Sequence, residues 1–171
     1  VDSSFNPGGT GFQTISPGKI RAINVLANGK ILIGGDFDRV NTSPRTKIAR
    51  LNDDSTLDSG FQVNTMATGN YFSSITDIYH IVSQSDGKLL LSGQFTYLVS
   101  GVSKKNVVRL NENGSIDPTF NLGIVIEDLF PSSNLSTNKP VPRADGKVVV
   151  GTTRDNGVNS IIAPLLLNSN G

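Results

Sequence analysis

The chain contains no cysteine and no tryptophan, and it has one methionine and one histidine. Without cysteine it has no disulfide, no thiolate nucleophile and no cysteine-based zinc site. Its 15 basic and 14 acidic residues nearly cancel, which removes the positive charge expected of a nucleic-acid-binding protein. No apolar run approaches the roughly 18 residues that span a bilayer. The sequence therefore predicts neither a nucleic-acid partner nor a membrane span.

What the sequence does contain is small, polar and turn-forming. Charged residues make up only 17% of the 171 positions, whereas glycine occurs 18 times and proline 8 times. This composition is typical of many short strands joined by tight turns, and it argues against a helical bundle.

Three blocks of sequence recur in the same order. A Gly-Lys pair followed by an apolar run begins at Gly29, Gly87 and Gly146, with separations of 58 and 59 residues. The sequence Arg-Leu-Asn recurs at Arg50 and Arg109, and an Asp-x-x-Phe block ends at Phe5, Phe61 and Phe120. Tandem repeats of this length are typical of arrays in which each unit packs on its neighbours. The chain is thus predicted to be one repeat domain, 1–171, with units at about 1–57, 58–116 and 117–171.

Within each unit the local signals are those of β-hairpins. Asn-Gly and Asp-Gly at Gly29, Gly87 and Gly146 favour type I′ turns, in which both central residues have positive φ. The runs 31–33, 89–91 and 148–150 are apolar at consecutive positions, so these strands are expected to be covered on both faces. A second hairpin follows in each unit, and 37–47 and 95–105 are expected to be loops between strands two and three.

The predicted fold class is therefore all-β, with three four-stranded antiparallel units of about 57–59 residues arranged as β-propeller blades. A β-solenoid is the main alternative. Solenoid coils are usually shorter, and they lack two hairpin turns each.

The composite pattern resembles a known repeat family. Its elements are Gly29-Lys30, Gly34-Gly35 and Ile48-Ala49-Arg50-Leu51-Asn52 in the first unit, and Asp86-Gly87-Lys88, Arg109-Leu110-Asn111 and Asp117-Pro118-Thr119-Phe120 in the second. This pattern is similar to the delta-60 repeats of bacterial and phage proteins. The resemblance implies propeller-like blades in large secreted, cell-surface or virion proteins, and it implies no catalytic residue.

The third unit departs from the pattern. Pro140 and Pro142 fall where strand one runs in the other units, and proline cannot donate to a central ladder, so this strand is expected to be bent, short or at an edge. Three blades are fewer than the four to eight of known propellers. The alternatives are a longer array of which this is a part, or copies that assemble head to tail.

The repeated charged residues admit two interpretations. Arg50 and Arg109 each precede by eight residues an aspartate, Asp58 and Asp117 respectively. They could form a ring of charges that binds a ligand, or an ion pair within each blade that recurs because the blade recurs. The second interpretation is favoured.

The aromatic residues divide in the same way. Phe5, Phe61 and Phe120 recur once per unit, as do Phe37 and Phe95, and repeated phenylalanines are expected in the core between sheets. Function on a repeat scaffold usually resides at the variable positions. The candidate ligand contacts are therefore the unrepeated aromatic residues Tyr71, Phe72, Tyr79 and Tyr97.

The sequence gives less support to a catalytic histidine or a metal site. His80 aligns with Ala22 and is expected to be an ordinary strand residue rather than a general base. No cofactor is expected; the oxygen donors for a loop calcium would be Asp36, Asp38, Asp53, Asp54 and Asp58, although aspartate is also a common turn residue.

The sequence thus favours a non-catalytic structural or recognition module at a cell surface, outside the cell or on a virion, similar to an adhesin or tail fibre. Its partners would be a glycan, a protein or neighbouring repeats and subunits. One alternative is a propeller hydrolase or lyase acting on glycans, for which the unit-specific carboxylates would be Asp77, Glu127, Asp128 and Asp155. A second alternative is an intracellular protein-interaction scaffold.

Overall fold

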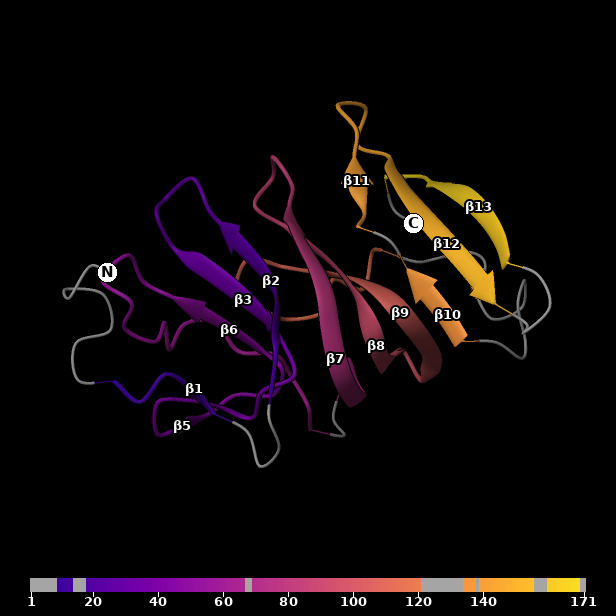
Figure 1. Ribbon diagram of the computed structural model, residues 1–171. Helices are drawn as coiled ribbons and strands as arrows, with labels where there is room; N and C mark the ends of the chain where they lie inside the picture. The colour runs from indigo at the N-terminus through magenta and orange to yellow at the C-terminus, as the bar shows by residue number, and fades with distance from the viewer. Residues whose placement is uncertain are drawn as a thin grey trace.

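The computed structural model describes residues 9–13, 18–66, 69–120, 134–137, 139–155 and 160–169. In these residues the chain is all-β, with antiparallel pairing throughout. Three principal sheets follow one another along the chain and stand side by side in Figure 1, each formed by one sequence unit. No helix long and apolar enough to cross a membrane occurs in the described part of the chain.

The first two principal sheets have the same strand order. The first consists of β2 (Ile20–Val25), β3 (Ile31–Gly35) and β6 (Ile48–Leu51), in that order across the sheet. The second consists of β7 (Tyr71–Ser83), β8 (Leu89–Val99) and β9 (Val102–Leu110). A β-bulge interrupts β2 between Ile20 and Ala22, and another interrupts β7 at the equivalent positions, Ile78 and His80.

In the third sheet the first strand is broken. Its two parts, β10 (Asn134–Thr137) and β11 (Val141–Pro142), both pair with β12 (Val148–Asp155), which also pairs with β13 (Ser160–Leu167). The two-residue β11 confirms the short edge strand expected from Pro140 and Pro142.

The hairpin turns are of a different type from the one expected. Gly29, Gly87 and Gly146 have φ of 82°, 80° and 78°, but the residue before each glycine does not have a positive φ. In the first turn the Gly29 amide donates to the Leu26 carbonyl and the Leu26 amide to the Lys30 carbonyl, and the other two turns repeat both bonds. This is the three-residue loop that ends in a left-handed glycine, so it requires one positive φ and not two.

The predicted fourth strand is reduced to a single bridge in the first two units. Leu51 pairs with Leu57, and Leu110 pairs with Ile116. The chain then turns at Asp58 or Asp117, whose carboxylate accepts the amide of the residue two positions on. Because this Asx turn bends the backbone away, the ladder ends after one pair.

The segments between strands two and three differ between the units. In the first unit, 37–47 contains β4 (Arg39–Val40) and β5 (Ser43–Pro44), which form a small sheet with β1 (Phe12–Gln13). In the second unit, the expected loop at 95–105 is wrong, because β8 and β9 continue through it to a tight turn at Ser100 and Gly101. Lys104 and Lys105 therefore lie in a strand.

The core lies between successive sheets. Leu32 of the first sheet packs with Ile78, Ile81 and Leu91 of the second in one cluster, whereas Leu90 packs with Val148 and Val150 of the third in another. The sheets approach closely at Gly34, where an added Cβ would lie 2.6 Å from Cγ2 of Ile78. The consecutive apolar residues of β3 and β8 are therefore buried on both faces, as predicted.

Candidate functional site

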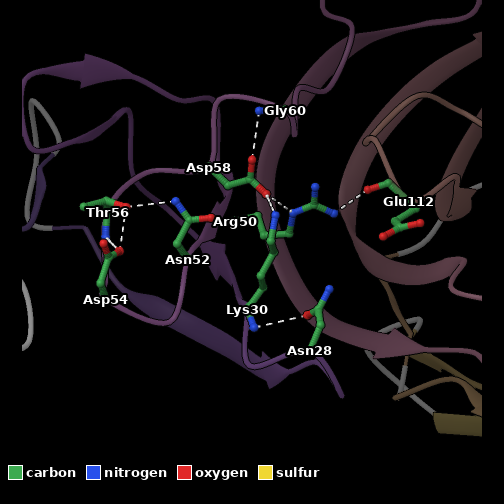
Figure 2. A network of polar contacts seen from close by, with 9 residues as sticks. All are labelled: Asn28, Lys30, Arg50, Asn52, Asp54, Thr56, Asp58, Gly60 and Glu112. Carbon is green, nitrogen blue, oxygen red and sulfur yellow. Dashed lines mark hydrogen bonds and ion pairs between the residues drawn. The ribbon is translucent and has the colours of Figure 1, made fainter.

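The repeated arginines each form a buried ion pair. Arg50 on β6 donates from Nε to Oδ2 of Asp58 at 2.7 Å, and Lys30, immediately before β3, donates to the same oxygen at 2.8 Å. Figure 2 shows both cations reaching this carboxylate while its other oxygen accepts the Gly60 amide. The second unit repeats the arrangement, with Arg109 Nε at 2.8 Å and Lys88 Nζ at 2.9 Å from Oδ2 of Asp117.

Each arginine also links its own unit to the next one. Nη1 of Arg50 donates to the Glu112 carbonyl in the turn of the second unit, and Nη1 of Arg109 donates to the Ser169 carbonyl at 2.6 Å in the equivalent turn of the third. The guanidinium carbons lie 4.9 Å from the ring centroid of Phe61 and 4.7 Å from that of Phe120, respectively. Each arginine side chain thus makes three kinds of contact: an ion pair with the aspartate after its unit's second hairpin turn, a cation–π contact with a core phenylalanine, and a hydrogen bond to the neighbouring unit.

These contacts decide between the two interpretations of the repeated charges. The side chains of Arg50, Asp58, Arg109 and Asp117 are all at least nine-tenths buried. Their charges are directed at one another and at backbone carbonyls, so the structural interpretation is confirmed for both pairs. Phe61 and Phe120 lie in the core as expected, whereas Phe5 lies outside the described residues.

The buried pairs also make stability depend on pH. Burial by itself would raise the pKa of Asp58, but the hydrogen bonds from Lys30 and Arg50 outweigh it and lower the pKa to about 2. The pKa of Asp117 is lowered by its bonds from Thr119 and Lys88 and by the charge of Arg109, again against burial. A carboxyl whose folded-state pKa is lowered stabilises the fold above its unfolded pKa of about 4, and this contribution is lost as the pH falls toward the folded value.

We expect the free energy of unfolding to fall by about 2 kcal/mol for Asp58 between about pH 4 and pH 2. Urea denaturation at a series of pH values measures this change. The Asp58→Asn variant should be less stable at neutral pH and should show a shallower loss in acid, while Asp145→Asn, at an exposed carboxyl, should follow the wild type. Wild-type stability that stays constant down to pH 2 would contradict the prediction.

Two of the four aromatic candidates for ligand contact are corrected by the structure. Phe72 and Tyr97 are only 2% and 1% exposed, and they pack with Phe95 in the core. The hydroxyl of Tyr97 donates to the Val107 carbonyl at 2.7 Å, and burial raises its pKa. Both residues lie in the paired strands that extend past the expected loop, so they face the core and cannot contact a ligand.

The other two candidates lie on β7 and are half-buried. Tyr71 begins the strand, and Tyr79 is the extra residue of the bulge near its middle. Tyr79 alone lies in a polar cluster: the guanidinium carbon of Arg21 lies 5.4 Å from its ring centroid, and its hydroxyl lies 3.5 Å from Oε1 of Gln94. The structure therefore distinguishes Tyr79 as the aromatic residue of a surface cluster.

That cluster joins the first two units along their first strands. Arg21 on β2 forms an ion pair from Nε to Oδ2 of Asp77 on β7, and β7 packs against β2 and β3. Arg21 and Gln94 are exposed, whereas Asp77 is buried. Oδ1 of Asp77 has no hydrogen-bond partner among the described residues. We call Arg21, Asp77, Tyr79 and Gln94 the inner-strand patch.

The patch occupies positions that the repeat does not conserve between units. In the register of Gly29 and Gly87, Asp77 corresponds to Lys19, Tyr79 to Arg21 and Gln94 to Asp36. The buried pairs Arg50–Asp58 and Arg109–Asp117 are equivalent through strand pairing, because Arg50 pairs with Leu32 and Arg109 with Leu90, which share a position in this register. The buried ion pairs at the second hairpin turn are therefore repeated, whereas the side chains of the inner-strand patch are specific to each unit.

His80 takes part in a separate contact within the second sheet. Its Nδ1 lies 3.1 Å from Oγ of Ser92, its pair partner on β8. Burial, followed by the positive charge of Lys139, lowers the pKa of His80. A neutral, half-buried imidazole bonded to a serine on the adjacent strand agrees with the expected strand residue.

The aspartates considered as calcium ligands are held in separate ion-pair and turn contacts. Asp36 and Asp38 both bind Nζ of Lys47, at 2.7 and 3.0 Å, while Asp58 binds Arg50 and Lys30. Asp53 and Asp54 lie in the turn, where Asp54 accepts the hydroxyl of Thr56 at 2.6 Å. Within the residues that the structure describes, no three acidic or histidine side chains group as a metal site. Glu127 and Asp128 lie outside the described residues, as does the side chain of Asp155.

The sheets, the glycine-ended turns and the buried Arg–Asp pairs define a repeat protein with β-propeller-type blades. Residues 26–61 and 84–120 match the model of a family described as a β-propeller domain of unknown function, DUF5122. Each matched segment begins at the first hairpin turn of a unit and ends at Phe61 or Phe120. It therefore contains the lysine, the arginine and the aspartate of that unit's buried ion pair. No curated protein sequence matches the chain.

Proposed function

We propose that this chain is a non-catalytic recognition module of an extracellular, cell-surface or virion protein, of the delta-60 repeat type, and that it binds a carbohydrate at the inner-strand patch. The observation that carries the proposal is the position of the patch, because unit-specific polar and aromatic groups gather at the junction of two otherwise repeated sheets. Repeat scaffolds commonly place binding residues at such variable positions.

The chemistry of the patch suits a sugar. A tyrosine ring supplies an apolar surface for the C–H face of a pyranose, and the guanidinium and amide beside it supply donors and acceptors for hydroxyl groups. Arg21, over the ring of Tyr79, and Gln94, at its hydroxyl, are both exposed, so both are accessible to a ligand that reaches the patch. Asp77 orients the guanidinium through the ion pair and takes no chemical step in this proposal.

A glycan array probed with the chain, followed by calorimetry on the glycans retained, tests the proposal. We expect Tyr79→Ala and Arg21→Ala each to weaken binding by about tenfold, the usual effect of removing a central contact. Tyr71→Ala is the matched comparison, because Tyr71 is also a half-buried tyrosine of β7 but lies at the start of the strand.

The outcomes separate the alternatives. Loss of binding with Tyr71→Ala but not with Tyr79→Ala would place the ligand elsewhere, and an array without any retained glycan would contradict carbohydrate binding. Release of reducing sugar from a retained glycan would show that the module is an enzyme, contrary to the proposal.

A further inference from the structure

The two outer faces of the array are apolar at positions that are buried inside it. On the first sheet, Ile20 and Ile23 of β2 are 46% and 63% exposed. Their equivalents on the second sheet, Ile78 and Ile81, are fully or nearly buried because they pack on the first sheet at Gly34. The same side chains in the same register thus pack on a neighbouring sheet in one unit and face solvent in the other. We call Ile20, Ile23 and Val25 the β2 strip.

The third sheet has a matching apolar row on its opposite face. Val141, Val149 and Leu166 are direct cross-strand partners on three adjacent strands, so their side chains share one face. Val141 and Leu166 are both 54% exposed, and Val149 is half-buried. The equivalent row of the second sheet, Val82, Leu90 and Arg109, forms the contact with the third. The row of the third sheet is therefore the face on which a following sheet would pack.

The third sheet also differs from the first two in a way that favours an apolar partner. Leu166 occupies the position of Arg50 and Arg109, which bind the backbone of the following unit. A leucine cannot make that bond, but it adds apolar area. Gly151 in turn occupies the position of Gly34, whose missing side chain accommodates Ile78 and Ile81. An isoleucine pair in the register of Ile20 and Ile23 fits opposite such a glycine.

We propose that a second copy of this chain docks head to tail, with the β2 strip of one copy packed on the row of Val141, Val149 and Leu166 of the other. The contact continues the sheet-on-sheet packing that already joins the units within one chain. It is heterologous, since the two surfaces differ, so an open assembly keeps one free β2 strip at one end and one free row at the other until a ring closes. This association is independent of ligand binding at the inner-strand patch.

Sedimentation velocity over a concentration series tests the proposal on the wild type, Ile23→Asp and Leu166→Asp. The wild type should associate as its concentration rises, and each variant alone should remain a monomer, because each has lost one of the two complementary surfaces. Both substitutions are at exposed side chains, so circular dichroism spectra and melting curves should match the wild type at low concentration.

Mixing the two variants provides the decisive measurement. Ile23→Asp retains an intact row on the third sheet and Leu166→Asp retains an intact β2 strip, so an equimolar mixture should form a heterodimer and nothing larger. A monomeric wild type at every concentration would overturn the proposal. So would association of Leu166→Asp by itself, since that would show two β2 strips packing on each other, or failure of the mixture to associate.

Discussion

Replacing Arg109 with alanine is expected to lower the free energy of unfolding by about 3 kcal/mol, the low end of the cost of breaking a buried ion pair. The substitution removes the bond to Asp117, the bond to the Ser169 carbonyl and the cation–π contact with Phe120. It leaves the buried Asp117 with Lys88, which is only 2.9 Å away but is partly exposed. Chemical denaturation followed by circular dichroism measures the loss.

The chain offers a matched control for this prediction. Arg143 also forms an ion pair with an aspartate, Asp145, but at 3.5 Å with both side chains largely exposed. Arg143→Ala should therefore change stability by less than about 1 kcal/mol. Arg109→Lys should recover only part of the loss, because one ammonium cannot replace the separate bonds of a guanidinium. An Arg109→Ala variant with an unchanged denaturation midpoint would refute the structural role of the pair.

The features that could be predicted from sequence are those that depend on neighbouring residues. A glycine after Asn or Asp, flanked by apolar runs, predicted each hairpin, and the spacing of Arg50 and Asp58 predicted their pairing across the second hairpin turn. The eight-residue separation spans one tight turn, so the partners are held together by local geometry. The exact turn type was wrong, because Asn-Gly is compatible with more than one loop and the strands select the three-residue one.

The burial of Phe72 and Tyr97 could not be predicted in the same way. Both lie in a segment of the second unit that differs from the first, so the repeat gave no guide to its conformation. Their burial follows from β7, β8 and β9 continuing as paired strands and from the mutual packing of Phe72, Phe95 and Tyr97. Long strands of this kind are stabilised by tertiary contacts that sequence propensity does not contain.

For a related reason, the sequence predicts only part of the inner-strand patch. Tyr79 was predicted because it is aromatic and unrepeated, whereas Arg21 and Gln94 carry no such signal. They join Tyr79 because β7 packs against β2 and pairs with β8, which brings residues 56 positions apart in the chain into one ion pair. Aligning the units by their Gly-Lys pairs would have placed Arg21 and Tyr79 at one repeat position, which was the available signal.

Replacing Ile81 with alanine is expected to lower the free energy of unfolding by about 2–5 kcal/mol, as for other large-to-small changes in a packed core. Ile81 is 4% exposed and lies in the cluster between the first and second sheets, with its Cδ1 directed at Gly34. Truncation leaves a cavity that rigid paired strands on both sides cannot fill by moving together. Thermal and urea denaturation at low protein concentration measure the effect on a single copy.

Ile23→Ala is the internal control, because Ile23 has the same side chain, strand position and pair register one unit earlier but is 63% exposed. At low protein concentration it should change stability by less than about 0.5 kcal/mol, as is usual for exposed positions. The difference between the two variants then measures what packing on a preceding sheet contributes to one repeat position. Equal losses in the two variants would show that Ile23 is already covered in the single chain. This result would contradict the exposure of the β2 strip on which the head-to-tail proposal depends.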